Sequence, residues 1–309
     1  MAAAERDTAH CAINPTEFSK SQVHLQSVQD FLLDVADKAN IRTTAKQVVL
    51  DVGCGPGMVT KELMLPLIQE HLEKFYAFDV SPVMIEIAKQ KNSDKNIEYF
   101  VADMEDWYGI LRILSSEGYT NSAFKLRKQL EHWEGRITTL MSIHCFNWVR
   151  DQRKAFEHVK KLLKPNGVAC LLFPLQATFY DAMEDIKVHP KWKDILMGVD
   201  DRIPESHQKK WDYKHYLDIV QELGFEIVRC ESRSIRDVAV SDDHYKLFFS
   251  SLCVFLESIP ESKREEFKQD FFEELLKKNG RTGEKKLPYH DGCMLDIIIK
   301  KPAAENVCA

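Results

Sequence analysis

The sequence lacks the features that mark membrane proteins, secreted proteins and nucleic-acid-binding proteins. No apolar stretch approaches the length of a membrane span, and the N-terminus has no apolar segment of the signal-peptide kind. The eight cysteines include no C-x-x-C pair, so we expect buried thiols of a reducing compartment rather than disulfides or a metal site. A formal net charge of −6 argues against nucleic acid as a partner. We therefore expect a cytoplasmic protein with no membrane span and no metal.

The stretch that organises the chain is V-V-L-D-V-G-C-G-P-G, residues 48–57. Its aliphatic start predicts a buried parallel strand, and Val59, Leu63 and Leu67 recur at the spacing of one helix face. Glycines at alternate positions between them let a backbone approach a ligand closely. The spacing G-x-G-x-G differs from the G-x-G-x-x-G that seats a pyrophosphate, which favours a ligand without phosphates. The candidate ligand-binding residues here are Asp51, Gly53, Cys54, Gly55 and Gly57.

Two further predicted strands end in acids. Residues 75–79 end in Asp79, which precedes Val80, and a carboxylate there can accept hydrogen bonds from a ribose diol. Residues 97–102 are followed by Asp103 and Met104, an acid and a thioether that suit an adenine amine and ring. A glycine turn and two strand-end acids in this order predict a nucleoside site.

The pattern of the whole chain predicts an α/β fold with a doubly wound parallel sheet. Four strand-helix units precede a fifth strand, which is expected at 168–173 after a turn at 164–167. A helix is expected at 23–39, where Val28, Leu32, Val35 and Ala36 share one face, and Asp151 is expected to cap the helix before the turn. We expect a disordered lead at 1–13 and a single domain at 14–309, with a ligand-binding core at 41–175. Residues 108–136 read as an insertion of unknown role. Helical additions at 176–222 and 240–290 can cover the substrate side of the sheet.

D-V-G-C-G-P-G, F-D-V-S and V-A-D-M, in this order, resemble the class I S-adenosylmethionine (SAM)-dependent methyltransferases. The resemblance implies a seven-stranded, mostly parallel sheet whose last two strands are antiparallel, and SAM as the cofactor. It implies that the strand-end residues above bind SAM, together with Ser142 in the fourth strand, residues 137–143.

A narrower resemblance concerns the acceptor. S-I-H-C-F-N-W-V-R-D-Q-R-K-A-F at 142–156, followed by L-L-K-P-N-G, is similar to the juvenile hormone acid O-methyltransferases, which esterify farnesoic acid or juvenile hormone acids. This likeness implies that Trp148 and Gln26 hydrogen-bond the substrate carboxylate, and uncharged donors suit an anion that must stay nucleophilic. Two departures are Asn147, where the family commonly has histidine, and the longer segment at 108–136. A core-packing role for Trp148 stays open.

Three hypotheses remain at this point. A SAM-dependent O-methyltransferase of a small apolar acid needs no base, because a carboxylate is ionised near neutral pH. A methyltransferase of another small metabolite would use a histidine base, with His144 at the end of the fourth strand or a histidine in the additions as candidates: His207, His215, His244 and His290. The third is a non-catalytic, methyltransferase-like partner protein. A homodimer stays open for all three.

Overall fold

The computed structural model describes residues 13–21, 25–39, 41, 46–105, 133–199 and 202–303. The predicted lead, 1–13, lies outside these residues except for residue 13. Most of the predicted insertion, 108–136, also lies outside them, and only residues 133–136 are described. The chain forms two compact units. Unit 1 comprises Met1–Ser27, Pro174–Trp211 and Ser234–Met294, and unit 2 comprises Val28–Phe173, Asp212–Arg233 and Leu295–Ala309.

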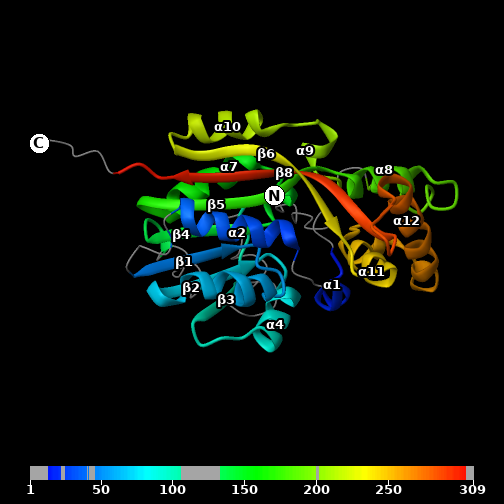
Figure 1. The fold of residues 1–309 in the computed structure, drawn as a ribbon, viewed down its shortest axis with the longest axis horizontal. Helices are drawn as coiled ribbons and strands as arrows, with labels where there is room; N and C mark the ends of the chain where they lie inside the picture. The colour runs from blue at the N-terminus through cyan, green and yellow to red at the C-terminus, as the bar shows by residue number, and fades with distance from the viewer. Residues whose placement is uncertain are drawn as a thin grey trace, which may run out of the picture. The chain divides into compact units, whose positions relative to one another are not determined.

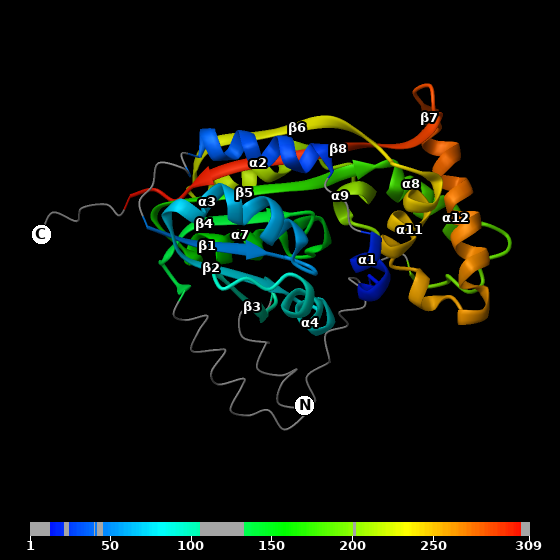
Figure 2. The ribbon, with the colours of Figure 1, turned by 60° about the horizontal axis from the view of Figure 1, so that its bottom comes forward.

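The sheet has the strand order β3-β2-β1-β4-β5-β8-β6, with β7 paired to β8 (Figure 1). The pairs β1–β2, β1–β4, β2–β3 and β4–β5 are parallel, and Figure 2 shows β8 running opposite to β5 and β6. The predicted mostly parallel seven-strand path and its antiparallel last pair are therefore confirmed. The strands are β1 Gln47–Val52, β2 Leu72–Asp79, β3 Ile97–Val101, β4 Ile137–Ile143, β5 Leu163–Ala177, β6 Glu226–Val238, β7 Arg281–Thr282 and β8 Leu287–Lys300.

The helix predicted after the glycine turn forms with a different buried face. Thr60–Met64 is a π-helix, followed by α3, Leu65–Ile68, and a 3-10 turn at Gln69–His71. The Leu65 N–H donates to the Thr60 carbonyl five residues back, and this wider turn rotates the following side chains. Consequently Thr60, Met64, Leu65 and Ile68 are buried, whereas the predicted Val59, Leu63 and Leu67 are only half-buried.

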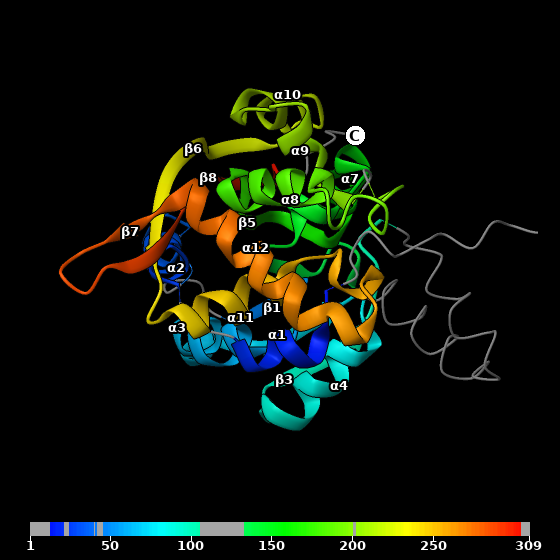
Figure 3. The ribbon, with the colours of Figure 1, turned by 90° about the vertical axis from the view of Figure 1, so that its right-hand side faces the viewer.

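The other helices of unit 2 follow their apolar spacing. In α2, Gln26–Lys38, the predicted face of Val28, Leu32, Val35 and Ala36 is buried. The Asp151 carboxylate accepts the Lys154 N–H at 3.0 Å and caps α7, Gln152–Leu162, as predicted. Figures 1 and 3 show α2 and α3 on one face of the sheet and α7 and α10, Tyr213–Glu222, on the other. Helix α4, Pro82–Lys91, packs on β2 and β3.

The turn predicted at 164–167 interrupts pairing without ending the strand. Ile137 of β4 pairs with Leu163, and Thr139 pairs with Val168, so four residues of β5 oppose one of β4. Asn166 at the centre has φ 64°, a conformation that asparagine adopts more readily than most residues. The predicted fifth strand, 168–173, therefore becomes part of a fifteen-residue strand.

Unit 1 is built from helices around an aromatic core. Figure 3 shows α12 crossing α8 and α11, and these three helices pack on one another. The ring centroid of Phe179 lies 5.5 Å from that of Phe249 and 5.9 Å from that of Phe271. All three side chains are buried. The helices of this unit are α1 Pro15–Ser21, α8 Thr178–Val188, α9 Glu205–Gln208, α11 Asp242–Leu252 and α12 Arg264–Asn279, with 3-10 turns at Leu256–Ser258 and Glu261–Lys263.

Within the part of the chain that the structure describes, no helix is both long enough and apolar enough to cross a membrane. Of the six described cysteines, Cys54, Cys170 and Cys253 are buried as the sequence predicted, whereas Cys145, Cys230 and Cys293 are only half-buried.

Candidate functional site

The glycine loop after β1 is anchored to the end of β2. The N–H groups of Gly53 and Cys54 both donate to the Phe78 carbonyl, at 2.9 and 3.0 Å. All three loop glycines have positive φ: 77° at Gly53, 53° at Gly55 and 82° at Gly57. This backbone favours glycine at each position because other side chains are strained there.

The protein itself occupies the space beside two of these glycines. A Cβ at Gly53 would lie 2.3 Å from the Cys145 Sγ, and one at Gly57 would lie 2.7 Å from the Tyr99 hydroxyl oxygen. The sequence argument assigned all three glycines to close approach by a ligand. At Gly53 and Gly57, side chains at the end of β4 and in β3 make the close approach. Gly55 is therefore the loop position to which the argument of close approach by a ligand applies best.

Asp79 lies at the end of β2 and accepts hydrogen bonds from the backbone. Its Oδ2 accepts the Gly55 N–H and its Oδ1 accepts the Ser81 N–H, each at 2.9 Å. Burial raises the pKa of this carboxyl, and the two N–H groups act in the opposite direction. Each oxygen keeps a second lone pair, so the carboxylate can still receive two hydroxyl groups. Val80 follows and is half-buried.

Asp51 in β1 is only 2% exposed, and its Oδ2 accepts the Thr60 hydroxyl at 2.6 Å. Burial raises the pKa of Asp51 to about 7, with a smaller contribution from the nearby charge of Asp79. The adjacent Cys54 is also buried, which raises the pKa of its thiol well above the usual range. Asp51 therefore changes charge near neutral pH, and Cys54 stays a thiol.

The predicted adenine-binding pair is held by groups outside the motif. The Asp103 Oδ1 accepts the Glu105 N–H at 2.8 Å, and the buried Met104 has its carbonyl 2.7 Å from the His158 Nδ1 in α7. A carbonyl only accepts, so Nδ1 carries the proton. The sequence argument missed Glu105 and His158. His158 lies on the buried apolar face of α7, and a histidine at such a position in the sequence pattern could have indicated it.

The end of β4 lies against the glycine loop. The Ser142 hydroxyl donates to the Val52 carbonyl at 2.8 Å, so this predicted cofactor contact joins β4 to β1. Cys145 occupies the space beside Gly53. The backbone N–H of Trp148 donates to the Cys145 carbonyl at 2.9 Å. Phe146–Trp148 is a 3-10 turn, and Trp148 is half-buried. Trp148, the residue predicted to bind the methyl acceptor, therefore lies one 3-10 turn from Cys145, which contacts the glycine loop.

His144 is in the left-handed region, φ 55°, and its N–H donates to the Leu172 carbonyl at 2.8 Å. Burial lowers the pKa of its imidazole to about 4. A ring with so low a pKa is neutral at physiological pH and binds a proton weakly. His144 lies near the glycine loop through its neighbour Cys145, but its chemistry is poor for a general base.

Three of the other candidate histidines lie in unit 1. His244 Nε2 is 3.0 Å from the Ser21 carbonyl, and His290 Nδ1 is 3.1 Å from the Thr178 hydroxyl. The buried His207 has Nε2 3.4 Å from an Asp181 carboxylate oxygen, and burial lowers its pKa. His215 is in α10 of unit 2, beside the ring of Tyr216. Gln26 begins α2 in unit 1 with an exposed side chain, and its proposed contact with a substrate stays a prediction.

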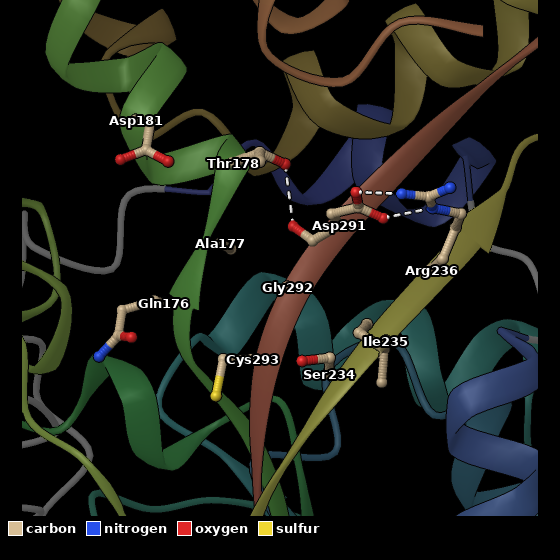
Figure 4. A pocket seen from close by; sticks show the side chains of 10 residues that line it. All are labelled: Gln176, Ala177, Thr178, Asp181, Ser234, Ile235, Arg236, Asp291, Gly292 and Cys293. Carbon is tan, nitrogen blue, oxygen red and sulfur yellow. Dashed lines mark hydrogen bonds and ion pairs between the residues drawn. The ribbon is translucent and has the colours of Figure 1, made fainter.

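Unit 1 has an open groove of about 480 Å³ along the ends of β5, β6 and β8 (Figure 4). The charges on it are largely paired with each other, since the Arg236 guanidinium makes two 2.7 Å bonds to the Asp291 carboxylate. Asp181 of α8 lies at the rim, and Gly292 lies between β5 and β6. None of the sequence-predicted site residues lines this groove.

Comparison with known proteins identifies the family to which this chain belongs. The methyltransferase domain family matches residues 22–229, which is more than half of the chain. Juvenile hormone acid O-methyltransferase of Drosophila melanogaster is 24% identical over 85% of this chain and 82% of its own length. The Bombyx mori protein of the same name is 22% identical over 73% and 72% of the two chains.

Solved structures show the same fold at low identity. Phosphoethanolamine N-methyltransferase 2 of Haemonchus contortus, in complex with S-adenosyl-L-methionine, gives a TM-score of 0.52 at 13% identity, covering 96% of this chain and 58% of that one. The YcgJ protein of Bacillus subtilis gives 0.51 at 13% identity, covering 89% and 99%. The chain therefore belongs to the methyltransferase domain family, and it is a SAM-dependent methyltransferase.

Proposed function

We propose that this enzyme transfers a methyl group to the carboxylate of a small apolar acid, of the farnesoic acid or juvenile hormone acid type. The observation that carries the proposal is the position of Trp148, one short turn from the Cys145 that packs on Gly53. An indole N–H there would meet an acceptor close to the cofactor. The likeness to two proteins named juvenile hormone acid O-methyltransferase, over most of the chain, supports this substrate class.

The strand-end residues fit SAM as the cofactor. Asp79 would hold the ribose diol through its remaining lone pairs, and Asp103 with Met104 would contact the adenine. Gly55 presents backbone without a side chain beside Asp79. SAM supplies an electrophilic methyl group when it is bound. The other predicted cofactor-binding residues would complete the site: Asp51, Gly53, Cys54, Gly57, Val80 and Ser142. Asp51, Ser142, Gly53 and Gly57 also shape it through contacts within the protein.

The chemistry left to the protein is alignment and exclusion of water. A carboxylate acceptor is already ionised, so no proton has to be removed. This suits a site whose nearest histidine, His144, has a pKa lowered to about 4 by burial. Trp148 and Gln26 would donate hydrogen bonds to the carboxylate without neutralising it. We also propose that the additions at 176–222 and 240–290 hold the apolar tail.

The second candidate is methylation of another metabolite with a histidine base, and it finds no support in His144 or His207, since burial lowers the pKa of both imidazoles. A turnover assay separates the candidates. The full chain is incubated with SAM and with farnesoic acid, a saturated fatty acid, benzoic acid or farnesol, and methyl products are measured by mass spectrometry. We expect a methyl ester of farnesoic acid and no methyl ether of farnesol.

Each contrary result has a definite reading. Methylation of hydroxyl or amine acceptors but of no acid would refute the carboxylate assignment and favour the histidine-base reaction. SAM binding with no methylation of any acceptor would favour a non-catalytic, methyltransferase-like partner protein.

A further inference from the structure

Glu105 connects two loops that the proposed reaction uses. One Glu105 oxygen, Oε1, accepts the Arg150 N–H at 2.9 Å and the Asp151 N–H at 2.8 Å. Glu105 directly follows Asp103 and Met104, and Arg150 and Asp151 directly follow the turn that carries Trp148. The carboxylate therefore joins the cofactor loop after β3 to the acceptor loop after β4.

The hydrogen bonds that Glu105 accepts from the loop after β4 place its carboxylate where the backbone favours negative charge. Two successive N–H groups converge on one anionic oxygen just before the first turn of α7, where the helix dipole also favours negative charge. Hydrogen bonds from N–H groups to a carboxylate are about twice as strong as neutral ones. Glu105 thus fixes the backbone that leaves Trp148.

Both loops are also fixed to α7, so Glu105 acts on a stiff element. His158, two turns along α7, bonds the Met104 carbonyl. The buried Gln152 at the start of α7 donates to the Phe146 and Val149 carbonyls, each at 2.6 Å, on either side of Trp148. Gln152 thus holds the turn that carries Trp148, and Glu105 connects the chain after this turn to the loop after β3.

We propose that Glu105 is a positioning residue that couples binding of SAM to the placement of Trp148. This proposal rests on the proposed function for the contact of Asp103 and Met104 with SAM and for the role of Trp148 in turnover. When the cofactor orders Asp103 and Met104, the Glu105 N–H bonded to Asp103 fixes the side chain that holds Arg150 and Asp151. Coupling is reciprocal, so a Trp148 turn held in place also favours SAM.

Fluorine NMR of the full chain labelled with 5-fluorotryptophan tests the coupling without any acceptor. The chain has five tryptophans, and Trp148→Phe identifies the resonance of Trp148. Saturating SAM should shift that resonance in the parent. In Glu105→Ala the shift should be lost while SAM still binds, with Kd raised about three- to tenfold, the size of the net contribution of one ordinary hydrogen bond. An unchanged SAM-induced shift in Glu105→Ala would overturn the proposal.

Conservative variants separate positioning from general stability. Glu105→Gln keeps an acceptor oxygen and should restore most of the shift. Glu105→Asp keeps the charge but shortens its reach, and should lose the shift; it also serves if the alanine variant does not fold. Glu98→Ala removes an exposed acid of β3, the strand before Glu105, where it is paired with Lys74, and should leave the Trp148 resonance and SAM affinity unchanged. Equal loss in Glu98→Ala and Glu105→Ala would contradict a specific role.

Turnover adds a second readout. Glu105→Ala should lower kcat about tenfold in the parent but cause no further loss in a Trp148→Phe background, while SAM Kd still rises in both. Independent, multiplying losses in kcat would show that Glu105 does not act through Trp148. If no acid is methylated at all, the proposed function fails, and the NMR result still decides the coupling.

Discussion

Carboxylates that follow the strands of unit 2 and carboxylates of unit 1 are held by different partners. In unit 2, Asp79 accepts N–H groups from Gly55 and Ser81, and Glu105 accepts N–H groups at the start of α7. These acids receive dipoles but no neutralising cation in those bonds. The backbone fixes the direction of these side chains.

In unit 1 the carboxylates form ion pairs with cations. Asp291 pairs with Arg236, and Asp242 makes two bonds of 2.6 and 2.7 Å to the Arg281 guanidinium. Lys268 bonds Glu17 at 2.6 Å and so joins α12 to α1. Such pairs cancel charge and join segments distant in sequence.

The difference separates a ligand site from a scaffold. A carboxylate held by backbone N–H groups has lone pairs left for hydroxyl groups, and its orientation does not depend on flexible side chains. A carboxylate paired with lysine or arginine on the surface contributes little beyond about 1 kcal/mol and has less to offer a ligand. The comparison is consistent with the proposed cofactor site at the ends of β1, β2 and β3.

The largest expected effect is at Gly55. Gly55→Val should weaken SAM binding by up to about a hundredfold, because a branched side chain would intrude beside Asp79, and overpacking costs about 1–3 kcal/mol. The matched control is Gly135→Val, which has a similar φ of 66° but no atom within 4 Å of an added Cβ. It carries the same backbone strain and should bind SAM normally by calorimetry. Equal loss in both variants would assign the effect to strain alone.

The next largest effect concerns the proposed acceptor contact. Trp148→Phe keeps most of the ring and deletes the indole N–H, so kcat should fall about tenfold or more, from a lost hydrogen bond of roughly 1.5–3 kcal/mol. Gln26→Leu should do the same. Melting temperature and SAM affinity should stay near those of the parent. A loss of stability with intact specific activity in Trp148→Phe would make this residue core packing.

A smaller effect is expected from the titration of Asp51. Its pKa in the folded protein, about 7, lies above the ordinary 3.8, so the folded state binds more protons than the unfolded state between these values. This group therefore favours folding at acidic pH, and that contribution is lost as pH rises to about 7. Asp51→Asn should remove this pH dependence and be more stable than the parent at pH 8. Melting curves at pH 6 and 8 measure it, and parallel behaviour of the two proteins would contradict it.

The smallest effect is expected in unit 1. Arg281→Gln breaks the exposed pair with Asp242 and should cost less than about 1 kcal/mol of unfolding free energy. SAM affinity should not change. Urea denaturation measures the cost, and a loss of several kcal/mol would show that this pair does more than join two segments.

The first three strands of the sheet could be predicted from the sequence because their apolar runs end in acids or glycines. Asp79 and Asp103 were placed correctly at strand ends for that reason. The face of the helix after the glycine loop was predicted one residue out of step, since a π turn gives no apolar signal of its own.

The supporting residues of the site were harder to predict. Cys145 beside Gly53 and Tyr99 beside Gly57 depend on packing between strands far apart in sequence. Glu105 gave no signal either, because its partners are backbone N–H groups, which every residue but proline has. The low pKa of His144 follows from burial, which a strand-end position in the sequence does not reveal.

The most direct test of the account is one calorimetric comparison of SAM affinity in Asp79→Ala and Asp291→Ala. Asp79 is held by backbone N–H groups in unit 2, and Asp291 is paired with Arg236 in unit 1. We predict that Asp79→Ala weakens SAM by roughly 1–3 kcal/mol, the range for hydrogen bonds to a charged group, and that Asp291→Ala binds SAM like the parent. Parent-like binding by Asp79→Ala, or an equal loss in both variants, would contradict the assignment of the cofactor site.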